Sequence, residues 1–260
     1  MILSELAAHA RKRVEAAKQE KPLEAIRAQA LALPKGDFRF EKALRQPRAA
    51  LICEVKKASP SKGVIDAEFD YLAIARDYQA GGADCISCLT EPKWFLGSDE
   101  IFADIRKAVT LPMLRKDFTV DEYQLYESTL LGADAVLLIC ALLDTRTIAR
   151  YLGICEALGI SALVETHDAA EIGSAVRAGA RLIGVNNRNL KDFSVDFSNA
   201  ESLRRLVPET AVFVAESGVQ SPADVAALRQ AGAGAVLVGE ALMRAENRQE
   251  MLQQFLEAAQ

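Results

Sequence analysis

The sequence predicts an α/β protein, a (β/α)8 barrel with an N-terminal helical extension, from two observations. From Leu51 onward, short apolar strands alternate with amphipathic helices, and eight such units follow one another. The strands are apolar throughout, which is typical of parallel strands covered by helices. Eight consecutive units of this length most economically close into a barrel. An open doubly wound sheet is the alternative, but the GxGxxG turn that normally follows its first strand is absent.

Each predicted element follows from the period of its apolar residues. The strands are expected at Leu51–Val55, Cys85–Leu89, Pro112–Arg115, Ala135–Cys140, Ala162–Glu165, Leu182–Val185, Val212–Ala215 and Ala235–Val238. The helices are expected at Phe69–Ala80, Asp99–Val109, Asp121–Leu131, Thr145–Leu158, Asp168–Ala178, Ser198–Leu206, Ser221–Ala231 and Arg248–Ala258.

Residues 1–48 precede the first strand and are rich in helix signals. Apolar residues recur at helical spacing from Ile2 to Val14, and a second helix is expected to begin at Pro22 and to stop at Pro34. This segment has no strand partner. We therefore expect residues 1–260 to form a single barrel domain, with residues 1–48 packed on the barrel as an extension.

Composition and charge favour a small-molecule partner. The 260 residues include 31 basic and 36 acidic side chains, which leave a net charge of −5, and no basic block is long enough to bind nucleic acid. The longest apolar run, Ala135–Leu143, is too short to cross a membrane, and the N-terminus lacks a signal-peptide core. We expect a cytoplasmic protein without nucleic-acid or membrane partners, a monomer or weak homo-oligomer.

The cysteines and histidines indicate neither a metal site nor a histidine-based mechanism. Five cysteines, an odd number, lie mostly in apolar runs and are expected to be reduced and buried. Cys85 and Cys88 form a CxxC, but positions i and i+3 of a strand point to opposite faces, so the two thiols could not bind the same metal ion. His9 and His167 are expected to be ordinary surface or capping residues. Since no nucleotide-binding fingerprint is present either, we expect no metal and no cofactor, and proton transfer by Lys and Glu.

Polar residues stand at the C-terminal ends of the predicted strands, where barrel enzymes build their active sites. Alternation places Glu54 and Lys56 on one face of the first strand. Later strands end in Lys116, Glu165, Asn186, Arg188, Glu216, Ser217, Gly218 and Gly239. A single such residue could mark a strand's exit into solvent. Two lysines and two or three carboxylates at one mouth indicate acid–base catalysis instead.

Ser217-Gly218 and Gly239 follow the seventh and eighth strands. Many barrels bind phosphate at these two positions through backbone N–H groups. Ordinary turn chemistry is the alternative explanation for loop glycines. Their position in the repeat favours a phosphorylated small-molecule substrate.

These motifs together resemble the indole-3-glycerol phosphate synthase family of tryptophan biosynthesis, in its monofunctional form. The resemblance runs nearly from end to end and includes the helical extension. It rests on Glu54-Val-Lys56-Lys-Ala-Ser59-Pro60-Ser61-x-Gly63, Leu89-Thr90-Glu91, Phe95-x-Gly97-Ser98, Lys116-Asp117-Phe118, Glu165, Asn186-Asn187-Arg188 and Ala215-Glu216-Ser217-Gly218.

The resemblance implies a carboxy-lyase that converts 1-(2-carboxyphenylamino)-1-deoxyribulose 5-phosphate to indole-3-glycerol phosphate, with loss of carbon dioxide and water. It implies that Lys116 is the general acid for ring closure and that Lys56 with Glu54 serves dehydration. Glu165 would stabilise or deprotonate the cationic ring intermediate. Which lysine acts at which step stays open.

The remaining site residues would orient and bind the substrate. By the resemblance, Asn186 and Ser217 complete the catalytic set by orienting substrate oxygens. The substrate-binding set would be Ser59, Phe95, Phe118, Arg188, Glu216, Gly218 and Gly239, with the two phenylalanines forming a slot for the anthranilate ring.

Two rival interpretations remain at this point. A phosphoribosyl anthranilate isomerase-like barrel would need an acid–base pair but not lysines on both the first and third strands. A non-catalytic barrel scaffold would need none of Lys56, Lys116 and Glu165.

Overall fold

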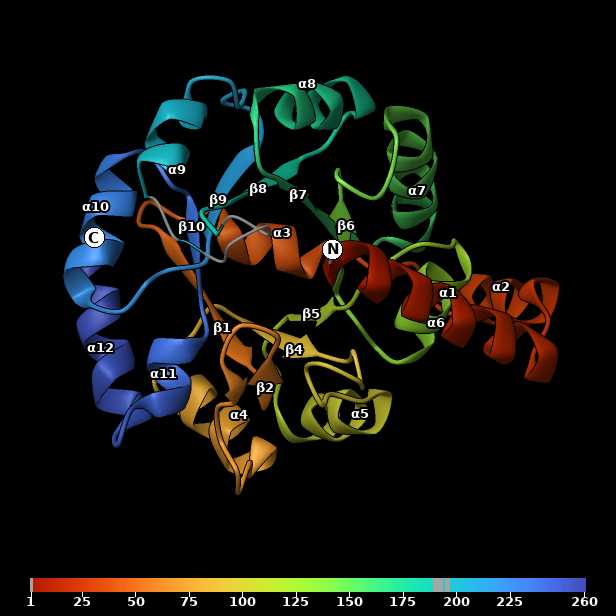
Figure 1. Ribbon diagram of the computed structural model, residues 1–260, viewed down its shortest axis with the longest axis horizontal. Helices are drawn as coiled ribbons and strands as arrows, with labels where there is room; N and C mark the ends of the chain where they lie inside the picture. Colours follow the sequence, from red (N-terminus) through yellow and green to blue (C-terminus); the bar gives the residue numbers. More distant parts are fainter. Residues whose placement is uncertain (1, 189–193, 195–196) are drawn as a thin grey trace.

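The computed structural model describes residues 2–188, 194 and 197–260. Eight parallel strands close into a barrel in the order β1-β10-β9-β8-β7-β6-β5-β4 (Figure 1). The barrel strands are β1 (Ala50–Val55), β4 (Cys85–Leu89), β5 (Met113–Lys116), β6 (Ala135–Ile139), β7 (Ser161–Thr166), β8 (Leu182–Asn186), β9 (Val212–Glu216) and β10 (Ala235–Val238). The predicted barrel is confirmed, and the open sheet is wrong.

Helices surround the barrel, and a helix follows each barrel strand along the chain (Figure 1). They are α4 (Tyr71–Ala80), α5 (Asp99–Ala108), α6 (Tyr123–Leu130), α7 (Thr145–Leu158), α8 (Ala169–Ala178), α9 (Phe197–Arg204), α10 (Pro222–Gln230) and α12 (Arg248–Ala258). Every predicted strand and helix is present, with ends within two residues of those expected. None of the helices in the described ranges is long and apolar enough to span a membrane.

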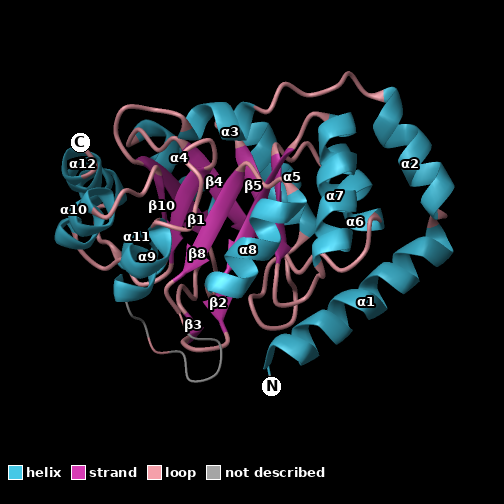
Figure 2. Ribbon diagram, turned by 90° about the horizontal axis from the view of Figure 1, so that it is seen from above, coloured by secondary structure: helices cyan, strands magenta, loops and turns pink. Residues whose placement is uncertain are grey.

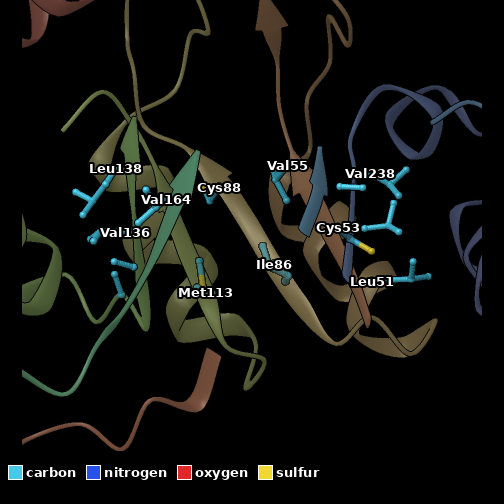
Figure 3. Close-up of a cluster of buried hydrophobic side chains, with 14 of the residues drawn as sticks. Leu51, Cys53, Val55, Ile86, Cys88, Met113, Val136, Leu138, Val164 and Val238 are labelled. Carbon is cyan, nitrogen blue, oxygen red and sulfur yellow. The ribbon is translucent and has the colours of Figure 1, made fainter. Parts of the chain in front are cut away.

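Alternation along each strand separates two apolar clusters. Leu51, Cys53 and Val55 point outward to the helices, where they join residues such as Cys88 (Figure 3). Ile52 lies between them on the chain but packs inside the barrel, as Cys85 does. The two cysteines of the CxxC therefore occupy opposite faces of β4 as predicted, and both are free thiols.

The N-terminal segment forms α1 (Ile2–Glu20), α2 (Leu23–Ala32) and α3 (Arg39–Leu44). Helix α2 packs on α6. Helix α3, which the sequence did not predict, buries Phe40 and Leu44 against the inward residues of the strands. Its place at the end of the barrel opposite the hairpin of β2 (Ala58–Ser59) and β3 (Gly63–Val64) is visible in Figure 2. The inner core is thereby closed at one end, and the other end is left for a site.

Three short elements at the open end also escaped prediction. They are the antiparallel hairpin of β2 (Ala58–Ser59) with β3 (Gly63–Val64), and α11 (Glu240–Arg244). Strands of two residues carry no period that a sequence can show.

Candidate active site

A cavity of about 170 Å³ opens at the C-terminal ends of the strands. All thirteen site residues expected from the sequence line it: Glu54, Lys56, Ser59, Phe95, Lys116, Phe118, Glu165, Asn186, Arg188, Glu216, Ser217, Gly218 and Gly239. They come from strands far apart in the sequence. Closure of the barrel brings them together.

Strand register explains why these side chains point inward. Leu114, Leu163 and Val214 pack in the inner core. Two residues further along the same strands come Lys116, Glu165 and Glu216, respectively. A period of two keeps these residues on the same inner face. The apolar layer therefore supports a charged layer directly above it.

Lys116 lies at the centre of the charged layer. Its ammonium nitrogen, Nζ, lies 3.0 Å from Glu216 Oε2, 3.9 Å from Glu54 Oε2 and 4.0 Å from Glu165 Oε2. Burial disfavours the charged amine, but the three carboxylates outweigh it and raise the pKa of Lys116 above its ordinary value. The ammonium therefore stays charged at neutral pH.

Glu216 is the carboxylate of this layer whose ionised form is disfavoured. Its side chain is only 1% exposed, and its Oε1 has no hydrogen-bond partner. Burial raises the pKa of Glu216 to about 7, with Glu165 adding to the rise, even though Lys116 opposes it. A Cβ on Gly184 of β8 would overlap Glu216 Oε1, so only glycine leaves room for this carboxyl group.

Glu54 has the opposite balance. Lys56 Nζ donates to Glu54 Oε1 at 2.6 Å, and Ser87 Oγ donates to Oε2 at 3.4 Å. Burial disfavours the charged form, but the ammonium groups of Lys56 and Lys116 outweigh it and hold the pKa of Glu54 below its ordinary value. The cavity thus combines one firmly ionised carboxylate with one, Glu216, that exchanges its proton near neutral pH.

The loop after β9 has a strained backbone. Ser217 has a φ of 69° and Gly218 a φ of 96°. Positive φ is uncommon for a residue other than glycine, and such strain is concentrated at functional sites. Asn187 Nδ2 donates to the carbonyl of Ser217 at 3.4 Å and supports the turn. On the neighbouring strand, Gly239 directly precedes α11.

An apolar wall closes the other side of the cavity. The rings of Phe95 and Phe118 lie 6.1 Å apart, and Ile2, Leu3 and Leu6 of α1 also line the space. The contribution of α1 was missed, because an amphipathic helix shows that it has an apolar face but not which surface that face covers. The start of α1 lies by β5 and β6 at the rim of the barrel in Figure 1, and at the end that carries the hairpin in Figure 2.

Polar contacts fix α1 in this place. Arg13 donates from Nη1 and Nη2 to Asp117 Oδ2 and Oδ1, at 3.0 and 2.6 Å. His9 Nδ1 lies 3.2 Å from Glu91 Oε1. Because Asp117 directly follows Lys116, this bidentate pair ties the extension to the strand that carries the central ammonium.

His167 differs from the expectation of an ordinary surface histidine. Its backbone N–H donates to Glu171 Oε2 at 2.8 Å, near the start of α8, so it does sit beside a helix end. Its side chain, however, is only 19% exposed, and its Nε2 lies 3.5 Å from Glu165 Oε1. The surface interpretation is therefore wrong. Among the described residues, no group of three or more His, Cys, Asp and Glu side chains is arranged to hold a metal ion.

Comparison with known proteins identifies the family. Residues 3–255 match the family model described as indole-3-glycerol phosphate synthase. The indole-3-glycerol phosphate synthase of Ruminiclostridium cellulolyticum is 54% identical over 245 residues, which cover 94% of each chain. That of Endomicrobium trichonymphae is 48% identical over 256 residues, which cover 98% of this chain and 99% of the relative. The chain belongs to the indole-3-glycerol phosphate synthase family.

Membership of this family establishes the reaction. The enzyme is a carboxy-lyase of tryptophan biosynthesis that makes indole-3-glycerol phosphate from a phosphorylated small-molecule substrate. The isomerase-like and scaffold interpretations are thereby set aside. A solved structure of 3-hexulose-6-phosphate synthase shares the fold, with a TM-score of 0.65 at 19% identity over 81% of this chain and all of that chain. A thiamine phosphate pyrophosphorylase from Pyrococcus furiosus does so with a TM-score of 0.62 at 16% identity, over 85% of this chain and 97% of that chain.

Proposed function

We propose that Lys116 is the general acid for ring closure. The aromatic carbon that bears the carboxylate attacks the ribulose carbonyl carbon, and the carbonyl oxygen gains negative charge as the new bond forms. A charged ammonium directed into the cavity can donate a proton to that oxygen. The position of Lys116 among three carboxylates is the observation that carries this assignment, because it keeps the amine protonated until substrate arrives.

Decarboxylation follows in the apolar part of the cavity. Phe95 and Phe118 form a slot for the anthranilate ring, in which the carboxylate is poorly solvated. The bonding pair of the departing carbon dioxide restores the aromatic ring and neutralises its cationic nitrogen. Glu165 supports this step because its negative charge stabilises the cationic ring intermediate.

Dehydration completes the reaction. Lys56, hydrogen-bonded to Glu54, protonates the departing hydroxyl group, which leaves as water. A carboxylate, Glu54 or Glu165, removes the proton from the neighbouring carbon as the last double bond forms. The two lysines, which contact the two oxygens of the same Glu54 carboxylate, thus divide the two acid steps between them.

The remaining lining residues bind and orient the substrate. Asn186 and Ser217 orient substrate oxygens, Glu216 accepts a hydrogen bond from a substrate hydroxyl, and Arg188 holds an anionic group of the substrate. Phosphate is bound by the loops of Ser59, Gly218 and Gly239.

Three broader properties complete the proposal. Residues 1–48 belong to the same domain as the barrel, because α1 lines the cavity and α3 closes the inner core at the opposite end of the barrel. The enzyme works in the cytoplasm as a monomer or weak homo-oligomer. Its turnover needs no cofactor, since the lysines and carboxylates of the cavity can carry every proton transfer.

A fluorescence assay for the indole product tests the proposed roles. Purified enzyme with 1-(2-carboxyphenylamino)-1-deoxyribulose 5-phosphate should form it, and Lys56→Met and Lys116→Met should each lose most of this activity. Full activity in either variant would remove that lysine from the mechanism.

A further inference from the structure

One ring nitrogen of His167 contacts Glu171, and the other points at Glu165 in the charged layer. Its Nδ1 lies 3.1 Å from Glu171 Oε2 on α8. An ionised carboxylate only accepts hydrogen bonds, so Nδ1 carries a proton. The other nitrogen, Nε2, is buried without a hydrogen-bond partner and lies 3.5 Å from Glu165 Oε1.

The charges around the cavity favour a proton on Nε2 as well. Three buried carboxylates, Glu54, Glu165 and Glu216, share the two ammonium groups of Lys56 and Lys116. An imidazolium at position 167 would supply a third cation next to them. It would contact Glu165 Oε1, whereas the Lys116 ammonium is nearest to Oε2 of the same carboxylate, at 4.0 Å.

The titratable groups that face the ring act in the same direction. Burial lowers the pKa of His167, but the hydrogen bond to Glu171 and the charges of Glu165, Glu171 and Glu216 outweigh it and raise that pKa. Cys140, after β6, is also near these carboxylates, but burial raises the pKa of its thiol to about 12, so it stays neutral. On the α9 side, Asn199 contacts His167 through its neutral amide, which donates to the backbone carbonyl of His167.

We propose that His167, as an imidazolium braced by Glu171, is the positioning residue for Glu165. It holds Oε1 of the carboxylate from outside the cavity, and so keeps Glu165 fixed in orientation when the cationic ring intermediate forms. This inference rests on the proposed role of Glu165. No bond to substrate is involved, so His167 affects the rate of the chemical steps and not substrate binding.

Imidazole NMR tests the geometry directly. The chain has only two histidines, so the variant His9→Gln leaves a single ring signal. That signal should titrate above the ordinary histidine value of 6.5 and fall toward it when Glu165→Gln is added. A ring that stays neutral wherever the enzyme is active, or that does not respond to Glu165→Gln, would overturn the proposal.

Single-turnover kinetics tests the consequence. The rate of the wild type should fall as pH rises through the titration of His167, because the imidazolium is lost. His167→Gln should be slower by roughly tenfold to a hundredfold at pH 6.5, the range of a hydrogen bond to a charged group, with unchanged substrate Kd and without that limb of the profile.

The parallel variant Glu165→Gln distinguishes a failure of the positioning role of His167 from a failure of the proposed role of Glu165. If Glu165→Gln is slow while His167→Gln keeps the wild-type rate and pH profile, the inference about His167 is wrong and the proposed mechanism stands. If Glu165→Gln keeps the wild-type rate, the proposed role of Glu165 is wrong, and the positioning role of His167 is overturned with it.

Discussion

Two neighbouring residues of β5, Arg115 and Lys116, each place a buried cation among carboxylates, but on opposite sides of the barrel wall. Arg115 points outward. Its Nη2 donates to both oxygens of Asp99 at 2.7 and 3.0 Å, its Nη1 lies 2.7 Å from Glu127 Oε2, and its Nε lies 3.3 Å from Thr90 Oγ1. Every nitrogen of the guanidinium therefore has a partner.

Lys116 points inward and is satisfied much less completely. Only Glu216 lies within hydrogen-bond distance, while Glu54 and Glu165 remain at 3.9 and 4.0 Å beside an open cavity. The two cations therefore differ in how completely their N–H groups are paired with acceptors. The outer cluster of Arg115, Asp99 and Glu127 has no capacity left for a ligand and supports the fold. The inner cluster of Lys116, Glu54, Glu165 and Glu216 keeps donors and acceptors that a substrate can use.

The largest effect on catalysis is expected from removal of the Lys116 ammonium. Lys116→Met keeps the bulk of the side chain but removes the ammonium. A donor needed mainly as the carbonyl oxygen gains charge stabilises the transition state more than the ground state, so the single-turnover rate should fall by about 10² to 10⁴ with little change in substrate Kd. If Kd weakens as much as the rate falls, Lys116 is a binding residue and the acid must be sought at Lys56.

The second effect concerns the surplus of negative charge in the inner cluster. The pKa of Glu216 is raised from an ordinary 4.5 to about 7, so folded protein binds the proton more tightly than unfolded protein. The stabilisation is complete below pH 4.5 and is lost as pH rises through 7, a loss of about 3 kcal/mol at 1.4 kcal/mol per tenfold change.

Glu216→Gln cannot titrate, so its free energy of unfolding should rise relative to that of the wild type by up to this amount between pH 4.5 and 8. Denaturant unfolding at several pH values measures the difference. Parallel curves for the two proteins would mean that Glu216 is ionised throughout and that the inner cluster is balanced.

A smaller effect tests the phosphate end of the cavity. Gly218 has a φ of 96°, so Gly218→Val should distort the loop that presents N–H donors and raise KM by roughly tenfold to a hundredfold. Gly179→Val is the matched control, since Gly179 has a φ of 87°, open space around it and no place in the cavity lining. Equal KM values for the two variants would place the phosphate elsewhere.

Removal of metal ions is expected to leave kcat unchanged. If lysines and carboxylates carry every proton transfer, enzyme dialysed exhaustively against EDTA should keep its full kcat without added metal or nucleotide. A requirement for either would contradict the all-side-chain mechanism.

The site residues whose positions depend on strand alternation could be predicted from the sequence. Glu54, Lys116, Glu165 and Glu216 each follow an inward apolar residue by two positions, and a period of two fixes their side of the wall. Closure of eight strands then brings them to one mouth. Neither step requires knowledge of the loops.

Features that depend on loop paths and docking could not be read in this way. Ile2 and Leu6 line the cavity because the start of α1 reaches the mouth, and the pair of Arg13 with Asp117 that fixes it joins residues far apart in the chain. The ring of His167 points at Glu165 because the turn after β7 brings it back toward the strand, while Glu171 holds its Nδ1. Local sequence patterns carry no signal for such contacts.

The most direct test of the contrast between the two clusters is the free energy of unfolding of Arg115→Met and Lys116→Met, measured side by side at pH 6. Arg115→Met should lose about 3 kcal/mol, because it leaves Asp99, Glu127 and buried hydroxyl groups without their partner. Lys116→Met should stay within about 1 kcal/mol of the wild type, because Glu216, with a pKa of about 7, already carries its proton at that pH and is not left as an unpaired charge. Equal losses in the two variants would contradict the account, since the inner cluster would then be as structural as the outer one.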